Sequence, residues 1–148
     1  MSTEIEFYVP GTPKAQPRVK ATIRGKHAGV YTPKTADVFK ASIIAAVRLE
    51  TCGRVFTGPL RVELYFDMPR PKSHFGTGKK ASEMKESAPY WHDQKSDVDN
   101  LSKAVLDALN NAGIWHDDAQ VCQLAASKRW CLTGGVNIVI GQPNTSRK

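Results

Sequence analysis

The sequence predicts an α+β fold: a mixed β-sheet of about four to six strands packed by two main helices, in a single domain covering residues 1–148. Three observations lead to this prediction. Apolar and polar residues alternate in several short stretches, as they do in half-buried strands. Two longer stretches carry apolar residues at helical spacing. A chain of 148 residues has the size of one domain and can bury a core without disulfides or metals.

Four strands are expected from alternation, and they fall at 3–9, 59–69, 119–130 and 134–141. The second, PLRVELYFDMP, is the clearest, because every second residue from Leu60 to Met68 is apolar. The pair Gly134-Gly135 is typical of a tight turn and predicts a hairpin between the last two strands.

Residues 10–34 contain six lysines or arginines and no acid. Gly25 and Gly29 predict two short strands around the turn RGKHAG. A single basic residue is most simply a solvated charge, but a whole block without acids predicts a surface that follows the phosphate backbone of DNA. The expected DNA-binding residues are Lys14, Arg18, Lys20, Arg24 and Lys26.

Two helices are expected between the strands. Residues 35–51, TADVFKASIIAAVRLET, have a broad apolar stripe. The second helix follows Asp99 and covers 100–111, where apolar residues recur every three or four positions. Gly113 follows its last apolar turn and can end the helix in a left-handed conformation.

Residues 70–95 show no sustained periodicity, which predicts a long loop or insertion that is functional or mobile. Within it, Tyr90 and Trp91 have two explanations. They anchor the loop by packing, or they stack on unpaired bases of a DNA substrate. Residues 142–148 are expected to form a loose tail.

The chain has 21 Lys and Arg residues against 14 Asp and Glu residues, a formal net charge of +7. This charge favours an anionic partner, although a soluble protein that is simply basic is an equal alternative. Three cysteines without a C-x-x-C pair argue against a disulfide framework and a thiolate zinc site. No membrane-spanning run, secretion signal or phosphate-binding loop is recognisable. We therefore expect a cytoplasmic protein with no membrane partner and no nucleotide cofactor.

The acids of this basic chain gather in residues 96–120, which hold five aspartates and one lysine, Lys103. Each aspartate has an ordinary explanation as a helix cap, a turn residue or a solvated charge. Capping needs only one carboxylate, however, and Asp97 and Asp99 are two residues apart. Such a pair is stabilised by a cation between them, and Mg²⁺ takes one or two carboxylates together with waters and phosphates. Lys103, one turn after Asp99, can contact a phosphate or form an ion pair.

The later pair, Asp117 and Asp118, can join this site only if the chain reverses beside the helix. The expected helix is roughly 18 Å long, and seven extended residues reach at most ~25 Å. The stretch AGIWHDD contains a glycine for the reversal, and Ile114 and Trp115 to pack on the helix. Only one of the two aspartates then faces the site, and spacing does not choose between them.

The run DVDNLSKAVLDALNNAGIWHDDAQV, which starts at Asp97, resembles the signature of the RusA family of Holliday junction resolvases, the crossover junction endodeoxyribonucleases. The matching elements are Asp-x-Asp-Asn-Leu-x-Lys, Asp-Ala-Leu and Gly-x-Trp-x-Asp-Asp. The resemblance selects Asp118 over Asp117. It implies that Asp97, Asp99, Lys103 and Asp118 are catalytic and that the three aspartates hold Mg²⁺, or Mn²⁺ as a substitute. It also implies a homodimer, a four-way DNA junction as the substrate, and an origin in a phage or prophage.

The expected reaction is Mg²⁺-dependent hydrolysis of DNA phosphodiester bonds in recombination and repair, with two subunits cutting opposite strands symmetrically. Lys103 either stabilises charge in the transition state or orients the attacking water. Two alternatives belong beside this expectation. One is a branched-DNA-binding module without catalysis, whose acids only cap and solvate. The other is a less selective nuclease acting on flaps and other branched DNA.

Overall fold

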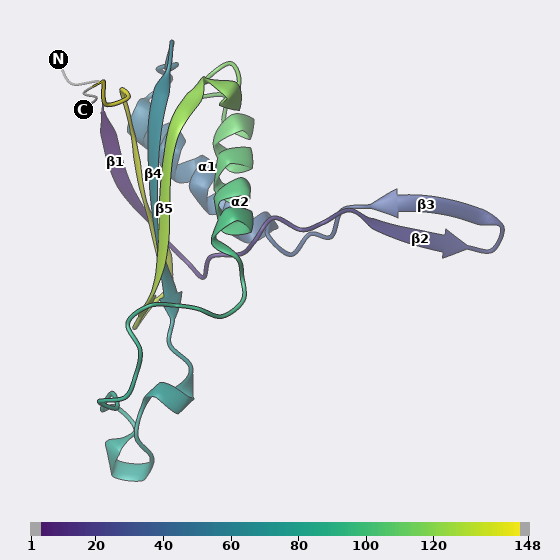
Figure 1. The fold of residues 1–148 in the computed structure, drawn as a ribbon. Coiled ribbons are helices and arrows are strands. Elements are labelled where there is room, and N and C mark those ends of the chain that lie inside the picture. The colour runs from purple at the N-terminus through teal and green to yellow at the C-terminus, as the bar shows by residue number, and fades with distance from the viewer. Residues whose placement is uncertain (1–3, 146–148) are drawn as a thin grey trace.

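The computed structural model describes residues 4–145 and confirms the predicted α+β class. The main sheet has the strand order β1-β6-β4-β5, and these strands are β1 (Ile5–Pro10), β6 (Gly135–Gly141), β4 (Leu60–Pro69) and β5 (Val121–Cys131). Figure 1 shows both helices, α1 (Asp37–Thr51) and α2 (Val98–Asn111), on one side of this sheet. The opposite side carries no helix within the described residues.

Strand β4 is an interior strand of the sheet and has a neighbour on each side. It pairs antiparallel with β6 and parallel with β5, while β1 pairs antiparallel with β6. Because parallel neighbours need a crossover connection, the chain passes from β4 through residues 70–97 and α2 before it enters β5. Helix α2 therefore runs opposite to β5, and the start of α2 lies beside the end of β5.

The core lies between the sheet and the two helices. The predicted alternation of β4 is confirmed, since its apolar residues from Leu60 to Met68 are buried at every second position. The same alternation in β1 buries Ile5, Phe7 and Val9 and leaves Tyr8 exposed on the bare side. The helices contribute buried apolar side chains, which include Phe39, Ile43, Val47, Leu101, Val105 and Leu109.

The predicted hairpin at Gly134-Gly135 is wrong. Strand β4 lies between β5 and β6, so these two strands are not neighbours. The crossover through α2 puts β5 on one edge of β4, and β6 then crosses to the other edge, where it pairs with both β4 and β1. The central position buries six of the seven residues of β6, which a two-stranded hairpin would leave exposed.

The predicted hairpin within 10–34 is confirmed. Strands β2 (Lys20–Arg24) and β3 (His27–Tyr31) form a separate antiparallel pair around a turn in which Gly25 has a φ of 60°. Figure 1 shows this pair, which we call the arm, extending well away from the body. The apolar side chains of the arm region stay uncovered: Val19 is 62% exposed, Ile23 78% and Val30 74%.

Residues 70–95 form a second projection (Figure 1), and they contain more structure than the sequence predicts. Two short 3₁₀ helices, η1 (Lys72–His74) and η2 (Gly78–Lys80), occur in them. The end of the segment is attached to the body, because Trp91 forms an isolated bridge with Arg129 of β5. No helix within residues 4–145 is long and apolar enough to cross a membrane.

At the C-terminal side, residues 142–145 have no regular secondary structure, but the backbone amide of Asn144 bonds the Gln123 side chain at 2.8 Å. Residues 146–148 of the predicted tail lie outside the described residues, as does Thr3 at the start of the first predicted strand. The three cysteines, Cys52, Cys122 and Cys131, are free thiols.

Candidate active site

The start of α2 presents two carboxylates to solvent. Asp97 is the cap residue, with an extended backbone (φ −67°, ψ 142°), and its carbonyl accepts the amide of Leu101 at 3.0 Å. Its carboxylate makes no capping hydrogen bond, and Asp99 lies one position into the first turn rather than at the cap. Both side chains are exposed. The ordinary explanation, in which Asp99 caps the helix, is therefore wrong, and both carboxylates face solvent near the positive end of the helix dipole.

Lys103 lies one turn further along α2 and is also exposed. Together with Asp99 it lines a hollow of about 290 Å³ between α2 and β5, whose other walls include Leu106, Leu124 and Ala126. None of the ion pairs found among residues 4–145 involves Lys103. The ammonium group is therefore available to a ligand in this hollow instead of being tied to Asp99.

The basic N-terminal segment lies against this acidic turn. The backbone amide of Gln16 donates to the carbonyl of Asn100, in the first turn of α2, at 3.0 Å. Lys14 and Arg18, two residues before and after Gln16, are exposed on this segment. The side-chain Oε1 of Gln16 is buried without a hydrogen-bond partner. Two of the five predicted DNA-binding residues are thus near the predicted catalytic residues.

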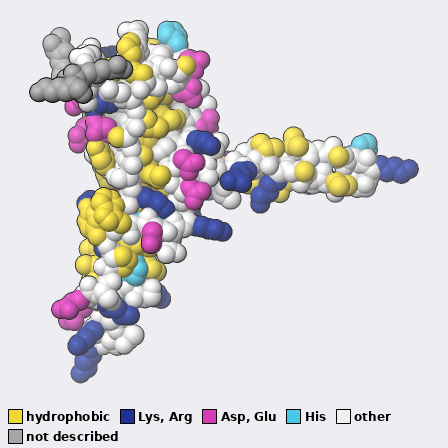
Figure 2. Space-filling view, viewed as in Figure 1, with side chains coloured by type: hydrophobic (Ala, Val, Ile, Leu, Met, Phe, Trp, Pro, Cys, Tyr) yellow, Lys and Arg dark blue, Asp and Glu magenta, His cyan; other side chains and the backbone are white. Residues whose placement is uncertain are grey.

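The other three basic residues, Lys20, Arg24 and Lys26, are exposed on the arm. Figure 2 shows basic side chains at the base and the tip of the arm, with apolar side chains between them. The same view shows acidic side chains following the edge of the body where α2 lies. The structure therefore separates the predicted DNA-binding set into a group beside the acids and a group on the arm.

One residue that the sequence did not single out holds the loop before α2. The ammonium of Lys128, on β5, donates to the carbonyl of Gln94 at 2.5 Å and to that of Ser96 at 2.6 Å. Ser96 directly precedes Asp97, so Lys128 fixes the backbone that carries the first carboxylate. A weak sequence signal was present, because Lys128 continues the alternation of Leu124 and Ala126 with a charged residue.

Asp118 lies at the opposite end of α2. It begins η3 (Asp118–Gln120), directly before β5. From Asp99 to the end of α2 is ~18 Å, and Val121 lies ~23 Å along β5 from Lys128, which touches the loop of Asp97. The chain does reverse beside α2 as predicted. The strand that runs back along the helix is β5, however, and Asp118 precedes it, so Asp118 stays at the far end of α2. The three carboxylates do not converge within one chain.

In agreement with this placement, residues 4–145 contain no group of three or more His, Cys, Asp or Glu side chains that could hold a metal ion. The two carboxylates at the start of α2 nevertheless suit a hard cation. Mg²⁺ is commonly held by one or two carboxylates, with waters and substrate phosphates as the remaining ligands. Asp97 and Asp99 are carboxylates of that kind, and Lys103 lines the same hollow as Asp99.

Residues 10–141 match the model of the family described as Endodeoxyribonuclease RusA. The chain belongs to the RusA family. It is 33% identical to the uncharacterized protein YqaN of Bacillus subtilis (strain 168) over 136 residues, which cover 92% of this chain and 94% of YqaN. Over a shorter stretch of 42 residues it is 48% identical to the crossover junction endodeoxyribonuclease RusA of Escherichia coli (strain K12), and equally to that of Enterobacteria phage 82. That stretch covers 28% of this chain and 35% of either relative.

Within this RusA-family chain, Asp117 and Asp118 differ in their chemistry. The Asp117 carboxylate accepts the amide of Ala119 at 2.9 Å, and the Gln120 side chain accepts the amide of Asp117, so the two form a capping box. The backbone hydrogen bond lowers the pKa of Asp117. The pKa of Asp118 is raised, first by its hydrogen bond with Asp117 and then by burial and the charges of Asp117 and Asp107. Asp117 thus shapes the turn, whereas Asp118 is exposed beside it.

Proposed function

We propose that this RusA-family protein is a Mg²⁺-dependent, structure-selective endodeoxyribonuclease that resolves four-way Holliday junctions by paired hydrolysis of phosphodiester bonds. One observation carries the proposal. Asp97, Asp99 and Lys103 face solvent together at the start of α2, and the basic segment around Gln16 is bonded to that same turn. An anion-binding surface directly beside two carboxylates is what a metal-assisted cut in a DNA backbone requires.

The chemistry divides among the residues as follows. Asp97 and Asp99 would hold a Mg²⁺ ion, and their exposure leaves room for waters and phosphate oxygens. Such an ion would supply a water of lowered pKa and polarisation of the scissile phosphate. The ammonium of Lys103 neutralises charge on the phosphate oxygens. Lys14 and Arg18 position the DNA backbone that leads to the site.

A homodimer matches the two-fold symmetry of a junction, and the arm supports this assembly. Its exposed apolar residues are unusual for a two-stranded hairpin, which is marginally stable alone in water. Covering Ile23 and Val30 with a second copy of the chain removes this exposure. A second subunit also offers a source for a third carboxylate at the start of α2, because the Asp118 of the same chain lies at the far end of the helix and residues 4–145 form no group of three ligating side chains.

Subunit mixing tests this role of Asp118. Asp97→Asn and Asp118→Asn proteins are prepared separately, each with low activity, and then mixed under conditions that exchange subunits. If Asp118 serves the other subunit's site, each mixed dimer keeps one intact site, and about a quarter of the wild-type sites return. Junction nicking then reappears on mixing. If each site is formed within one chain, every site keeps one substitution and mixing restores nothing.

The principal experiment is cleavage of a labelled synthetic four-way junction, with and without Mg²⁺. The wild-type protein is expected to make symmetric cuts only with the cation, and Asp97→Asn is expected to abolish cleavage while junction binding is retained or tightened. Asp93→Asn is the matched control, since Asp93 is an exposed aspartate just outside the motif and is expected to leave cleavage intact.

The two alternatives give different results in the same assay. A binding module without catalysis shows no Mg²⁺-dependent product, and its Asp97→Asn variant behaves as the wild type. A less selective nuclease cuts flap and linear duplexes as fast as the four-way junction. Either result would contradict the proposed function.

A further inference from the structure

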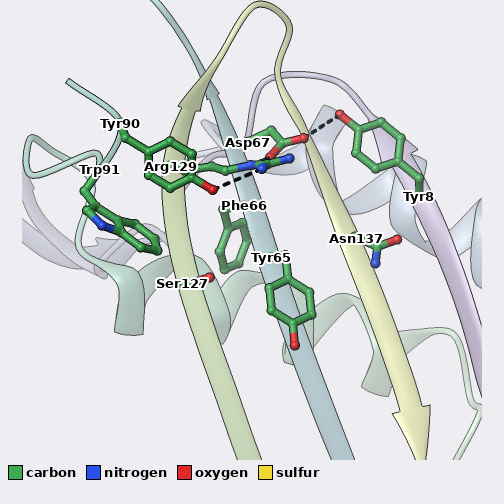
Figure 3. A pocket seen from close by; sticks show the side chains of 9 residues that line it. All are labelled: Tyr8, Tyr65, Phe66, Asp67, Tyr90, Trp91, Ser127, Arg129 and Asn137. Atoms are coloured by element: carbon green, nitrogen blue, oxygen red, sulfur yellow. Dashed lines mark hydrogen bonds and ion pairs between the residues drawn. The ribbon is translucent and has the colours of Figure 1, made fainter. Parts of the chain in front are cut away.

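The bare side of the sheet contains a hollow of about 540 Å³ that the proposed active site does not use. Its volume is within the usual range for small-molecule sites, ~300–1,000 Å³. Aromatic side chains dominate its walls, and they come from distant parts of the chain. Figure 3 shows Tyr90 and Trp91 on one side, Tyr8 on the other and Tyr65 between them on β4.

Tyr90 and Trp91 are exposed but held by the backbone around them. The amide of Trp130 donates to the carbonyl of Tyr90 at 2.9 Å, and Trp91 bridges to Arg129. Their rings meet edge to face, with centroids 4.8 Å apart. The Trp91 side chain is nevertheless 61% exposed. If the pair only anchored the loop by packing, the hydrogen bond of the Tyr90 carbonyl would be explained. The exposure of the Trp91 ring to solvent would not be explained.

The opposite wall, formed by Tyr8, requires a glycine at position 135. The ring of Tyr8 crosses β6 above Gly135, where an added Cβ would come within 1.9 Å of the Tyr8 hydroxyl. The Tyr8 hydroxyl donates to Asp67 at 3.4 Å, and Arg129 bonds the same carboxylate at 2.9 Å. Burial and the Asp67 carboxylate raise the pKa of Tyr8, so its hydroxyl stays protonated as a donor at neutral pH.

The charges around the hollow favour a neutral aromatic ring over a phosphate. Asp67 is paired with Arg129, so their charges cancel within the hollow. Glu63, on the same side of the sheet, is ion-paired with Arg61, and Glu6 accepts a hydrogen bond from Asn137 at 3.3 Å. Among the residues that line the hollow the cation, Arg129, is already paired with Asp67, so a phosphate gains little there, whereas a base carries no charge and stacks on aromatic side chains whatever its sequence. The Asn137 side chain donates from Nδ2 to Glu6 and leaves Oδ1 as an acceptor for the polar edge of such a ring.

This hollow and the hollow at α2 lie on the two sides of one edge strand. Ser127 of β5 lines the aromatic hollow, and its neighbour Ala126 lines the hollow that contains Asp99 and Lys103. A layer packed on one face of a sheet lies ~10 Å from it, so sites on the two faces are up to ~20 Å apart, and stacked nucleotides advance ~3.4 Å each along a strand. A single strand that passes over the edge of β5 can therefore reach both hollows within about six nucleotides.

From this arrangement we propose that the aromatic hollow binds one unpaired nucleobase of the DNA strand whose phosphate lies at the start of α2. This inference rests on the proposed nuclease function, because that function supplies the strand. The centre of a branched substrate is where unpaired or unstacked bases are available. Stacking in the hollow holds the strand in register with Asp97 and Asp99 and selects branched DNA over uninterrupted duplex.

Binding is tested with the full chain in EDTA, so that cleavage plays no part. The probes are a single-stranded oligothymidylate of about ten nucleotides and an abasic strand of equal length and charge. The wild-type protein is expected to bind the thymidylate more tightly, and its tryptophan fluorescence is expected to fall only with that probe. Trp91→Ala should weaken thymidylate binding about 5- to 150-fold and leave binding of the abasic strand unchanged.

Three further variants complete the test. Trp91→Phe keeps a stacking ring and should retain most of the affinity, whereas Tyr65→Ala, from the sheet wall, should weaken thymidylate binding as Trp91→Ala does. Tyr65→Ala also decides the outcome if Trp91→Ala does not fold. Leu49→Ala removes an even more exposed apolar side chain, on α1, and should have no effect.

Two results would overturn the inference. One is equal affinity of the wild-type protein for the two probes. The other is a Trp91→Ala protein with unchanged thymidylate binding but an altered sedimentation coefficient, which would make this side of the sheet a contact between subunits. The test is separate from that of the nuclease function. Base-dependent binding without Mg²⁺-dependent cleavage refutes the nuclease alone, and cleavage without base-dependent binding refutes the hollow alone.

Discussion

Replacing Lys128 by Met tests whether this lysine holds the carboxylate of Asp97 in place. Met has a side chain of similar length but cannot donate to the carbonyls of Gln94 and Ser96. The loop that ends at Asp97 would stay attached to β5 through Tyr90 and Trp91, but its last part, from His92 to Asp97, would depend on the longer bond from the His92 amide to the Lys128 carbonyl, at 3.4 Å. We therefore expect the loop to open more often while the core remains folded.

The size of the effect follows from the two contacts. A hydrogen bond from a charged donor contributes ~1.5–3 kcal/mol when buried. Lys128 is half-buried and water can replace the donor at the more exposed Gln94 carbonyl, so the combined loss is reduced to ~1–2 kcal/mol. A change of this size raises the open population about 5- to 30-fold. The cleavage rate should fall because Asp97 is no longer held beside the phosphate.

Hydrogen exchange measures the opening directly. The amide of Leu101, which bonds the Asp97 carbonyl, should exchange about 5- to 30-fold faster in Lys128→Met. Junction binding should change no more than in Lys85→Met, a control that removes the same charge from an exposed position on the loop. Unchanged Leu101 exchange together with a wild-type cleavage rate would refute the positioning role of Lys128.

Three other substitutions test separate parts of the structure. Gly135→Ala should drive the Tyr8 ring out of the hollow, destabilise the fold by ~1–3 kcal/mol in urea unfolding and weaken thymidylate binding; wild-type behaviour in both assays would contradict the placement of Tyr8. Burial, and secondarily the charge of Lys128, lowers the pKa of His92, which packs on Trp130. As the pH falls below ~6.5, His92 is therefore protonated in the unfolded chain before it is protonated in the folded chain, and the free energy of unfolding should fall until the pH passes the lowered pKa. The His92→Phe protein should lose this pH dependence, and identical urea midpoints against pH in both proteins would exclude it. Ile23→Ser should raise the dimer dissociation constant at least tenfold in sedimentation, since a buried Ile contributes ~1.5–3 kcal/mol, and an unchanged constant would show that the arm does not reach a second subunit.

Local patterns in the sequence were enough to predict several elements. The alternation in β4, the apolar stripe of α2 and the glycine turn of the arm each depend on residues close together in the chain, so each can be read from a short window. The grouping of Asp97, Asp99 and Lys103 was predictable for the same reason, because it lies within two turns of one helix. The reversal after Gly113, with Ile114 and Trp115 buried against the core, was equally local.

The strand order, and the contacts between segments that are far apart in the chain, were decided only by the tertiary structure. The order β1-β6-β4-β5 separates the two strands that the glycine pair suggested would be neighbours. The same order makes β5, and not the residues around Asp118, return to the start of α2, so Asp118 is left at the far end and Lys128 arrives there instead. These placements follow from burying the apolar side of β6 at the centre of the sheet, a gain that no short window of the sequence contains.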